Sequence, residues 1–144
     1  MNDRATFTHE ITTKEINHLY KISNDSGRAG PKDALFGLSC DSELVCATRL
    51  LNYNGCWLLR NLCTHPDYRH QGLASQLLQT LQQSGNAPDV IYTLPLPHLN
   101  NFYIRNHYQP VADKQVPEPL CQVLRQSRRR HKGILVMASC SSLR

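Results

Sequence analysis

The sequence predicts an α/β fold in which one mixed, mostly antiparallel, twisted sheet carries helices on both faces. Apolar runs of strand length alternate with segments whose apolar residues recur at helical spacing. Two short turn signals join neighbouring strand-like runs and favour hairpins. The length of 144 residues suits one domain, so we expect residues 1–144 to fold as a single unit.

In the first third of the chain, a short strand is expected at Thr6–Ile11 and a helix directly after it. Thr12-Thr13-Lys14-Glu15 has the pattern of a capping box, and apolar residues follow at helical spacing: Ile16, Leu19 and Tyr20. Asn24–Lys32 has loop composition. Two strands at Leu35–Cys40 and Leu44–Leu51 then flank a turn, and Asn54-Gly55 marks a second hairpin.

The rest of the chain continues the alternation. Trp57–Cys63 reads as a buried strand, and apolar residues at 73, 74, 77, 78 and 81 define one face of a helix. The remaining expected elements are strand Val90–Leu94, helix His98–Asn106, strand Gln109–Ala112, an extra helix Glu118–Arg130 and closing strand Gly133–Ser139.

The segment Thr64–Ser75 joins a strand to a helix through a turn with Gly72 at its tip. Such a junction exposes backbone N–H groups at the positive end of the helix dipole, which suits phosphate oxygens. Gly72 and Ala74 leave little bulk beside that backbone, and Arg69 adds a positive charge. No Walker loop and no G-x-G-x-x-G dinucleotide pattern is present here.

Two motifs resemble those of the GCN5-related N-acetyltransferase (GNAT) family. Arg69-His70-Gln71-Gly72-Leu73-Ala74 matches the family's R/Q-x-x-G-x-G/A signature. Phe102–Pro110 is similar to F-Y-x-x-x-G-F-x-P, with His107 in place of glycine and Tyr108 in place of phenylalanine. Glycine normally ends the helix there in a left-handed conformation, which histidine also tolerates.

The resemblance implies a GNAT-type fold, acetyl-CoA as co-substrate and no metal. In that family two central strands splay apart, and the pantetheine arm pairs with the backbone of the fourth strand, here Leu62, Cys63 and Thr64. The pyrophosphate would lie on the amides of the helix start, with Arg69 just before them. Those amides belong to His70, Gln71, Gly72, Leu73, Ala74 and Ser75.

The resemblance also implies direct attack of a primary amine on the thioester, with Tyr103 as the acid that protonates the departing thiolate. The general base is open. The positions where relatives carry a glutamate hold Leu58 and Ile91, and Leu96 replaces a common asparagine. Water, His65, His98 or Glu43 are the alternatives. The rival function is a non-catalytic acyl-CoA-binding regulatory domain with the same cleft.

The composition bears on three other classes of protein: those that bind nucleic acid, those that span membranes and those held by zinc or disulfides. The formal net charge is +5, and much of the excess lies in one run: Arg125, Arg128, Arg129, Arg130 and Lys132. Because no aromatic residues interleave these arginines, we do not expect nucleic-acid binding. No membrane span or signal peptide is recognised, and six cysteines without a C-x-x-C pair fit a reduced cytoplasm without zinc or disulfides.

The acceptor is left open as a small-molecule or protein amine. The loop at Asn24–Lys32 is too short for the second helix that usually shapes the family's acceptor pocket, so that side is expected to be open or completed by a partner. An exposed closing strand could pair across a homodimer axis.

Overall fold

The computed structural model describes residues 5–140 and contains a seven-stranded mixed sheet in the order β1-β2-β3-β4-β5-β7-β6. The strands are β1 (Thr6–Thr8), β2 (Ala34–Cys40), β3 (Glu43–Tyr53), β4 (Cys56–Thr64), β5 (Val90–Thr93), β6 (Gln109–Val111) and β7 (Val136–Cys140). The helices are α1 (Thr13–Ile22), α2 (Leu73–Gln83), α3 (Asn100–Arg105) and α4 (Glu118–Arg130). β4 and β5 pair in parallel, whereas β1–β2, β2–β3, β5–β7 and β6–β7 are antiparallel. The predicted fold class is confirmed.

β1, the helix expected at His98–Asn106 and β7 are among the elements that differ in extent from the prediction. β1 ends at Thr8, because the Thr8 hydroxyl accepts a hydrogen bond from the Glu10 amide and turns the chain. The helix expected at His98–Asn106 is divided into a 3-10 turn, Pro97–Leu99, and α3. β7 starts at Val136 because the residues before it form a turn, in which the Ile134 amide donates to the His131 carbonyl. The polar start Met1–Arg4 lies outside the described residues.

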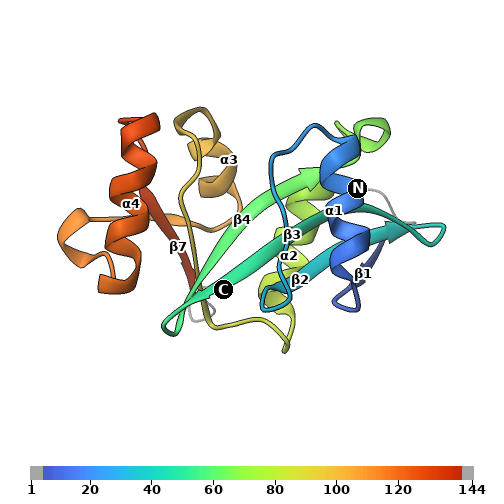
Figure 1. Cartoon of the computed structure of the whole chain (residues 1–144), viewed down its shortest axis with the longest axis horizontal. Helices are drawn as coiled ribbons and strands as arrows, with labels where there is room; N and C mark the ends of the chain where they lie inside the picture. The colour runs from blue at the N-terminus through green and yellow to red at the C-terminus, as the bar shows by residue number, and fades with distance from the viewer. Residues whose placement is uncertain (1–4, 141–144) are drawn as a thin grey trace. The chain divides into compact units, whose positions relative to one another are not determined.

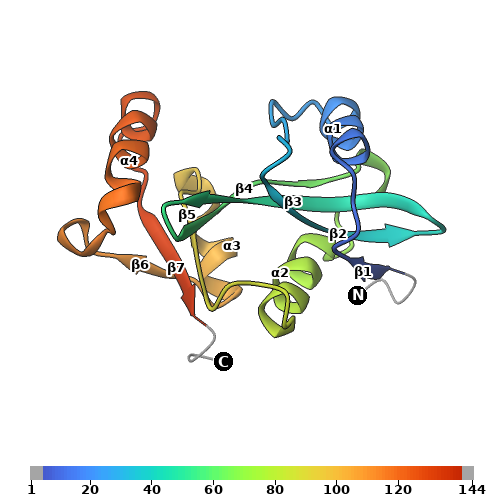
Figure 2. The same ribbon diagram turned by 60° about the horizontal axis from the view of Figure 1, so that its bottom comes forward.

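Backbone contacts divide the described chain into two compact units. The first holds the residues up to Leu51 together with Arg60–Asn86, and the second holds Asn52–Leu59 together with the residues from Ala87 onward. In the first unit, α1 and α2 lie on opposite faces of the strands (Figures 1 and 2). The first unit by itself therefore has the predicted arrangement, with helices on both faces of its strands.

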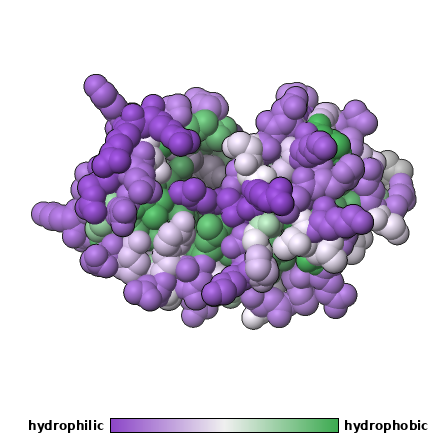
Figure 3. All heavy atoms as spheres, in the orientation of Figure 1, coloured by the Kyte–Doolittle hydropathy of each residue, from purple (hydrophilic) through white to green (hydrophobic). Residues whose placement is uncertain are grey.

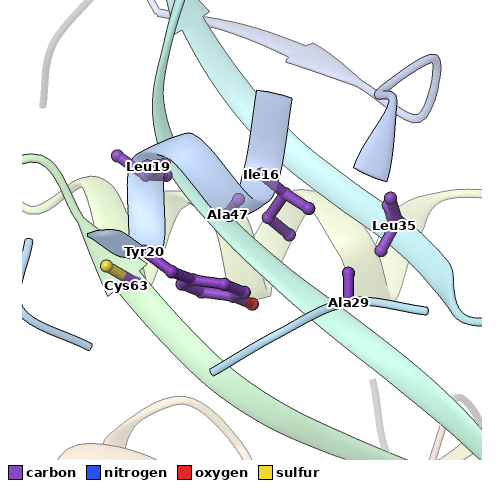
Figure 4. Packing of buried hydrophobic residues seen from close by; sticks show 7 residues of the cluster. All are labelled: Ile16, Leu19, Tyr20, Ala29, Leu35, Ala47 and Cys63. Atoms are coloured by element: carbon purple, nitrogen blue, oxygen red, sulfur yellow. The ribbon is translucent and has the colours of Figure 1, made fainter. Parts of the chain in front are cut away.

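The first unit buries the apolar face of α1 against its strands. Figure 4 shows this cluster, in which Ile16 and Tyr20 project from α1 toward the sheet and the Tyr20 ring extends from near Cys63 toward Ala29. The helix begins at the predicted capping box: the Thr12 hydroxyl accepts from the Glu15 amide, and the Glu15 carboxylate accepts from the Thr12 amide. The cluster comprises Ile16, Leu19, Tyr20, Ala29, Leu35, Ala47 and Cys63.

The second unit packs α4 against β5–β7. Leu120, Val123 and Leu124 on the inner face of α4 join Leu58 and Val136 in a buried cluster. The outer face of α4 is hydrophilic (Figure 3). Within the arginine run, Arg128 binds the Asp113 carboxylate through two nitrogens at 2.8 and 2.9 Å and also donates to the Ile134 carbonyl at 2.9 Å. One arginine of the basic run is therefore structural.

The end of α3 shows why His107 can stand where relatives have glycine. His107 has φ 71°, which is the left-handed conformation expected from the motif. The Tyr108 amide donates to the Tyr103 carbonyl and the His107 amide to the Ile104 carbonyl, which is the pairing of a Schellman motif. The rings of Tyr103 and Tyr108 pack edge to face, with 5.4 Å between their centroids, and this contact accompanies the motif.

Substitution of His107 tests this helix end. We expect His107→Val to lower the free energy of unfolding by about 1–2 kcal/mol, because a β-branched residue is strongly disfavoured at positive φ. His107→Gly should preserve stability or raise it by up to about 1 kcal/mol, since glycine adopts this conformation without steric cost. Urea denaturation of the three proteins measures both values, and equal losses in both variants would contradict the assignment.

Candidate functional site

The junction between β4 and α2 presents an exposed backbone at the start of a long helix. A 3-10 turn at Pro66–Tyr68 leads to His70 and Gly72, which have φ 64° and 76°. Gly72 precedes α2 without a side-chain cap, and the first helical hydrogen bond runs from the Gln76 amide to the Gly72 carbonyl at 3.0 Å. The amides of Leu73 and Ala74 come before that bond, so the helix offers them no earlier carbonyl.

The space beside Gly72 is open. A Cβ atom added there would meet no heavy atom within 4 Å, and His70, Gln71 and Gly72 are all exposed. A helix start with unobstructed amides and a positive dipole end fits an anionic group such as a diphosphate.

Arg69 is exposed and anchors this loop from the side. Its Nε donates to the Thr64 carbonyl and a terminal nitrogen donates to the Ser23 carbonyl, both at 3.4 Å. Ser23 ends α1, where helix carbonyls concentrate negative charge, so the guanidinium is stabilised there. The sequence predicts a positive charge at this loop. The structure shows which two carbonyls orient the Arg69 side chain.

The second half of β4 offers main chain rather than reactive side chains. The recorded pairs of β4 with β5 end at Leu59–Thr93, so Leu62, Cys63 and Thr64 lie beyond them. Cys63 is buried under α1, and burial raises the pKa of its thiol. The Thr64 hydroxyl donates to Cys46 Sγ at 3.5 Å, and burial raises the pKa of that thiol to about 12. Both cysteines therefore remain neutral thiols near neutral pH.

Asn61 has a left-handed backbone conformation in the middle of β4. Its φ is 54°, whereas an extended strand has negative φ throughout. The Asn61 side-chain oxygen accepts from Arg49 Nε at 3.2 Å and from a terminal nitrogen of Arg49 at 3.0 Å. The Asn61 side-chain nitrogen donates to Asp25 at 2.8 Å. Arg49 also binds Asp33 at 3.1 Å, and both side chains are largely buried, with 14% and 13% exposed.

These contacts outweigh the cost of the left-handed backbone. A non-glycine residue pays about 1–2 kcal/mol there, and each hydrogen bond to a charged group contributes about 1.5–3 kcal/mol. Sequence reasoning missed this network of Asp25, Asp33, Arg49 and Asn61. The only available signal was that asparagine tolerates positive φ better than most residues.

Tyr103 is held in the interior of the second unit. Its side chain is 6% exposed, and its ring meets Phe102 at 5.1 Å edge to face. Burial raises the pKa of Tyr103 to about 12, although a hydrogen bond with Thr93 acts in the opposite direction. The Thr93 hydroxyl itself donates to the Leu59 carbonyl at 3.2 Å. A neutral phenol with a fixed direction results.

The structure shows the surroundings of the side chains that were considered as the general base. His65 Nδ1 accepts from the Asp67 amide at 3.0 Å, and its Nε2 lies 3.9 Å from the exposed Glu43 carboxylate. One His65 nitrogen therefore caps the 3-10 turn, and the other faces the carboxylate. His98 is exposed in the Pro97–Leu99 turn, and Leu58 and Ile91 are buried apolar residues.

Two further properties concern the described residues only. Within residues 5–140, no group of three or more His, Cys, Asp or Glu side chains is arranged to hold a metal ion. None of the helices in the same range combines the length and the apolar content that crossing a bilayer requires.

The raised pKa of Tyr103 predicts a stability change at alkaline pH. Its folded-state pKa of about 12 exceeds the ordinary value of 10.0, so the stability gained from the neutral phenol is complete below about pH 10 and is lost as pH rises toward 12. The wild type should therefore lose stability relative to Tyr103→Phe across this range, by up to about 1.4 kcal/mol per pH unit. Urea denaturation at increasing pH measures the difference, and a constant difference would contradict the assignment.

Solved structures with a similar fold include proteins named as N-acetyltransferases. N-acetylglutamate synthase from Neisseria gonorrhoeae, complexed with coenzyme A and N-acetyl-glutamate, matches with TM-score 0.71 and 12% identity over 97% of this chain and 36% of that chain. The chain thus spans about a third of that enzyme. The ribosomal-protein-S18-alanine N-acetyltransferase from Escherichia coli matches with TM-score 0.66 and 15% identity over 94% of this chain and 93% of that one. At these identities the likeness shows the fold.

A third structure is the PaiA N-acetyltransferase from Thermoplasma acidophilum in complex with coenzyme A, with TM-score 0.62 and 11% identity over 94% of this chain and 98% of that one. No curated protein is similar enough in sequence to match the chain. The family model described as "Acetyltransferase (GNAT) domain" matches residues 31–110, which is more than half of the chain. That span includes β4, the turn around Gly72 and the end of α3, and the chain belongs to the GNAT acetyltransferase family.

Proposed function

We propose that this protein is an N-acetyltransferase that moves an acetyl group from acetyl-CoA to a primary amine by direct attack. The observation that carries the proposal is the exposed, uncapped start of α2 at Gly72, within the segment that the GNAT family model matches. Acetyl-CoA is the co-substrate, and no metal is required. Coenzyme A in the structures of relatives with this fold supports the choice of cofactor.

In this proposal the cofactor is held mainly by main chain. The pantetheine pairs with Leu62, Cys63 and Thr64, and the pyrophosphate lies on the amides of His70–Ser75 beside Arg69. The two compact units act together as one domain, because β4 contributes residues to both and the family match of residues 31–110 includes parts of both.

The chemical step needs a neutral amine and a stabilised leaving group. The amine nitrogen bonds to the thioester carbonyl carbon, the C–S bond breaks, and the thiolate takes a proton from Tyr103. Since Leu58 and Ile91 offer no base, the proton acceptor for the nitrogen is left open as water, His65, His98 or Glu43. Solvent returns a proton to the phenolate of Tyr103. A phenol with pKa about 12 gives its proton to a thiolate of pKa about 8.5 at a cost of about 5 kcal/mol. Tyr103 therefore acts best as a hydrogen-bond donor whose transfer accompanies C–S cleavage.

A second function is favoured by the same residues. A phenol that is buried and engaged by Thr93, together with apolar residues at both glutamate positions, suits an acyl-CoA-binding regulatory domain without turnover. Product formation from acetyl-CoA across a broad panel of amines separates the two functions. Both require the same cofactor cleft.

The acceptor is proposed only by class. The Neisseria and Escherichia relatives act on an amino acid and on a ribosomal protein alanine, respectively, by their names. For this chain we propose a small-molecule or protein amine, in the cytoplasm, with a homodimer as a further possibility to be measured by sedimentation. Binding of nucleic acid is not part of the proposal.

Gly72→Val tests the cofactor site. The substitution strains the backbone at φ 76° and fills the open space proposed for the pyrophosphate. We expect coenzyme A affinity to fall by about tenfold or more, since hydrogen bonds to a charged group are lost. Gly85→Val is the matched control, because Gly85 also lies beside open space but without positive φ. Equal affinities of both variants in calorimetry would reject the site.

Tyr103→Phe tests the chemistry. The variant should reduce kcat by about a hundredfold or more while coenzyme A affinity changes little, because the phenol acts on the leaving sulfur and not on binding. Steady-state kinetics with the best acceptor of the amine panel, together with calorimetry, measures both. Unchanged kcat would remove Tyr103 from the mechanism, and absence of product with every amine would favour the regulatory function.

A further inference from the structure

We propose that Asp25, Arg49 and Asn61 form a positioning network that sets the main-chain direction of β4 where the pantetheine binds. The same network fixes the loop between α1 and β2 to that strand. The inference rests on the proposed function, because it concerns the strand that would receive the cofactor. It assigns a role to residues that none of the family motifs contains.

The left-handed residue Asn61 directly follows a carbonyl that is itself hydrogen-bonded. The Thr48 hydroxyl, which is fully buried, donates to the carbonyl of Arg60 at 3.0 Å. Asn61 follows with positive φ, and Leu62–Thr64 come directly after it. A single left-handed residue in a strand changes the direction of the N–H and C=O groups that follow. The groups proposed to pair with pantetheine are therefore set by this residue.

The network admits one orientation of the Asn61 amide. Arg49 provides only donors, so it fixes the side-chain oxygen, and Asp25 provides only acceptors, so it fixes the nitrogen. Asp33 holds the remaining guanidinium nitrogen of Arg49 at 3.1 Å. Charges on both sides thus lock a neutral side chain, and through it the backbone of β4.

The loop enters the network through Asp25 and Gly27. Asp25 accepts from the Gly27 amide at 2.7 Å with the same oxygen that accepts from Asn61. A Cβ atom added at Gly27 would lie 2.5 Å from Asn61 Cγ, so this glycine packs directly on the Asn61 side chain. Gly30, in the same loop, has open space at the corresponding position. The loop therefore contacts Asn61 of β4 through both Asp25 and Gly27.

The experiment compares two ligands by calorimetry: coenzyme A, and 3′-phosphoadenosine 5′-diphosphate, which lacks pantetheine. Gly27→Ala should lower coenzyme A affinity by about tenfold, the effect of losing roughly one hydrogen bond to a charged group. Affinity for the nucleotide should stay unchanged, because it contacts only the start of α2. Gly30→Ala is the matched control and should bind both ligands as the wild type does.

The variants Asn61→Ala and Asn61→Gly separate the effect of the backbone conformation on binding from the effect of the side-chain hydrogen bonds. Asn61→Ala loses the bonds and keeps the cost of positive φ, so it should bind coenzyme A about tenfold more weakly. Asn61→Gly loses the same bonds but adopts positive φ without cost, so it should bind more tightly than Asn61→Ala. The nucleotide should bind both variants equally, and the melting temperature of each is measured alongside.

The outcomes are distinct. If the wild type binds coenzyme A and the Gly27→Ala and Asn61→Ala variants bind it equally well, the positioning role is wrong and the proposed function stands. If both ligands weaken in parallel, the network is only structural and the inference is likewise wrong. If the wild type binds neither ligand, the proposed function fails and the positioning role fails with it.

Discussion

The backbone of β4 is the constraint on which the rest of the structure depends. It changes direction at Asn61, and the segment that follows it turns again at His70 and Gly72 before α2 begins. Charged partners from elsewhere in the chain support the positive φ of Asn61, and the absence of a side chain permits that of Gly72. In this region, main-chain groups rather than reactive side chains are therefore the groups proposed to bind the cofactor.

That reliance on main chain explains the character of the neighbouring residues. Cys46 and Cys63 carry raised thiol pKa values because they are buried, so they pack as apolar side chains. His65 caps a turn, and Arg69 binds two backbone carbonyls. Around the proposed cofactor strand, polar and ionisable groups are thus used to hold the backbone in place.

Tyr103 differs from these residues, because its side chain and not the backbone is proposed to act. It is the one side chain in the proposal that must take part in chemistry, and yet its burial raises its pKa to about 12. The same burial fixes its direction through the Schellman motif that ends α3 and the ring of Tyr108. Burial therefore gives the phenol a fixed direction and a lower acidity, and both properties bear on the role proposed for Tyr103.

The sequence by itself determined the order of strands and helices, the capping box at Thr12, the uncapped helix start at Gly72 and the left-handed residue at His107. These features follow from local periodicity and from the backbone preferences of single residues, which neighbours in sequence express. Only the tertiary structure decided how Asp25, Arg49 and Asn61 meet, how deeply Tyr103 is buried and where Arg69 points. Those properties depend on contacts between residues far apart in the chain, and no local pattern encodes which distant partner a side chain will find.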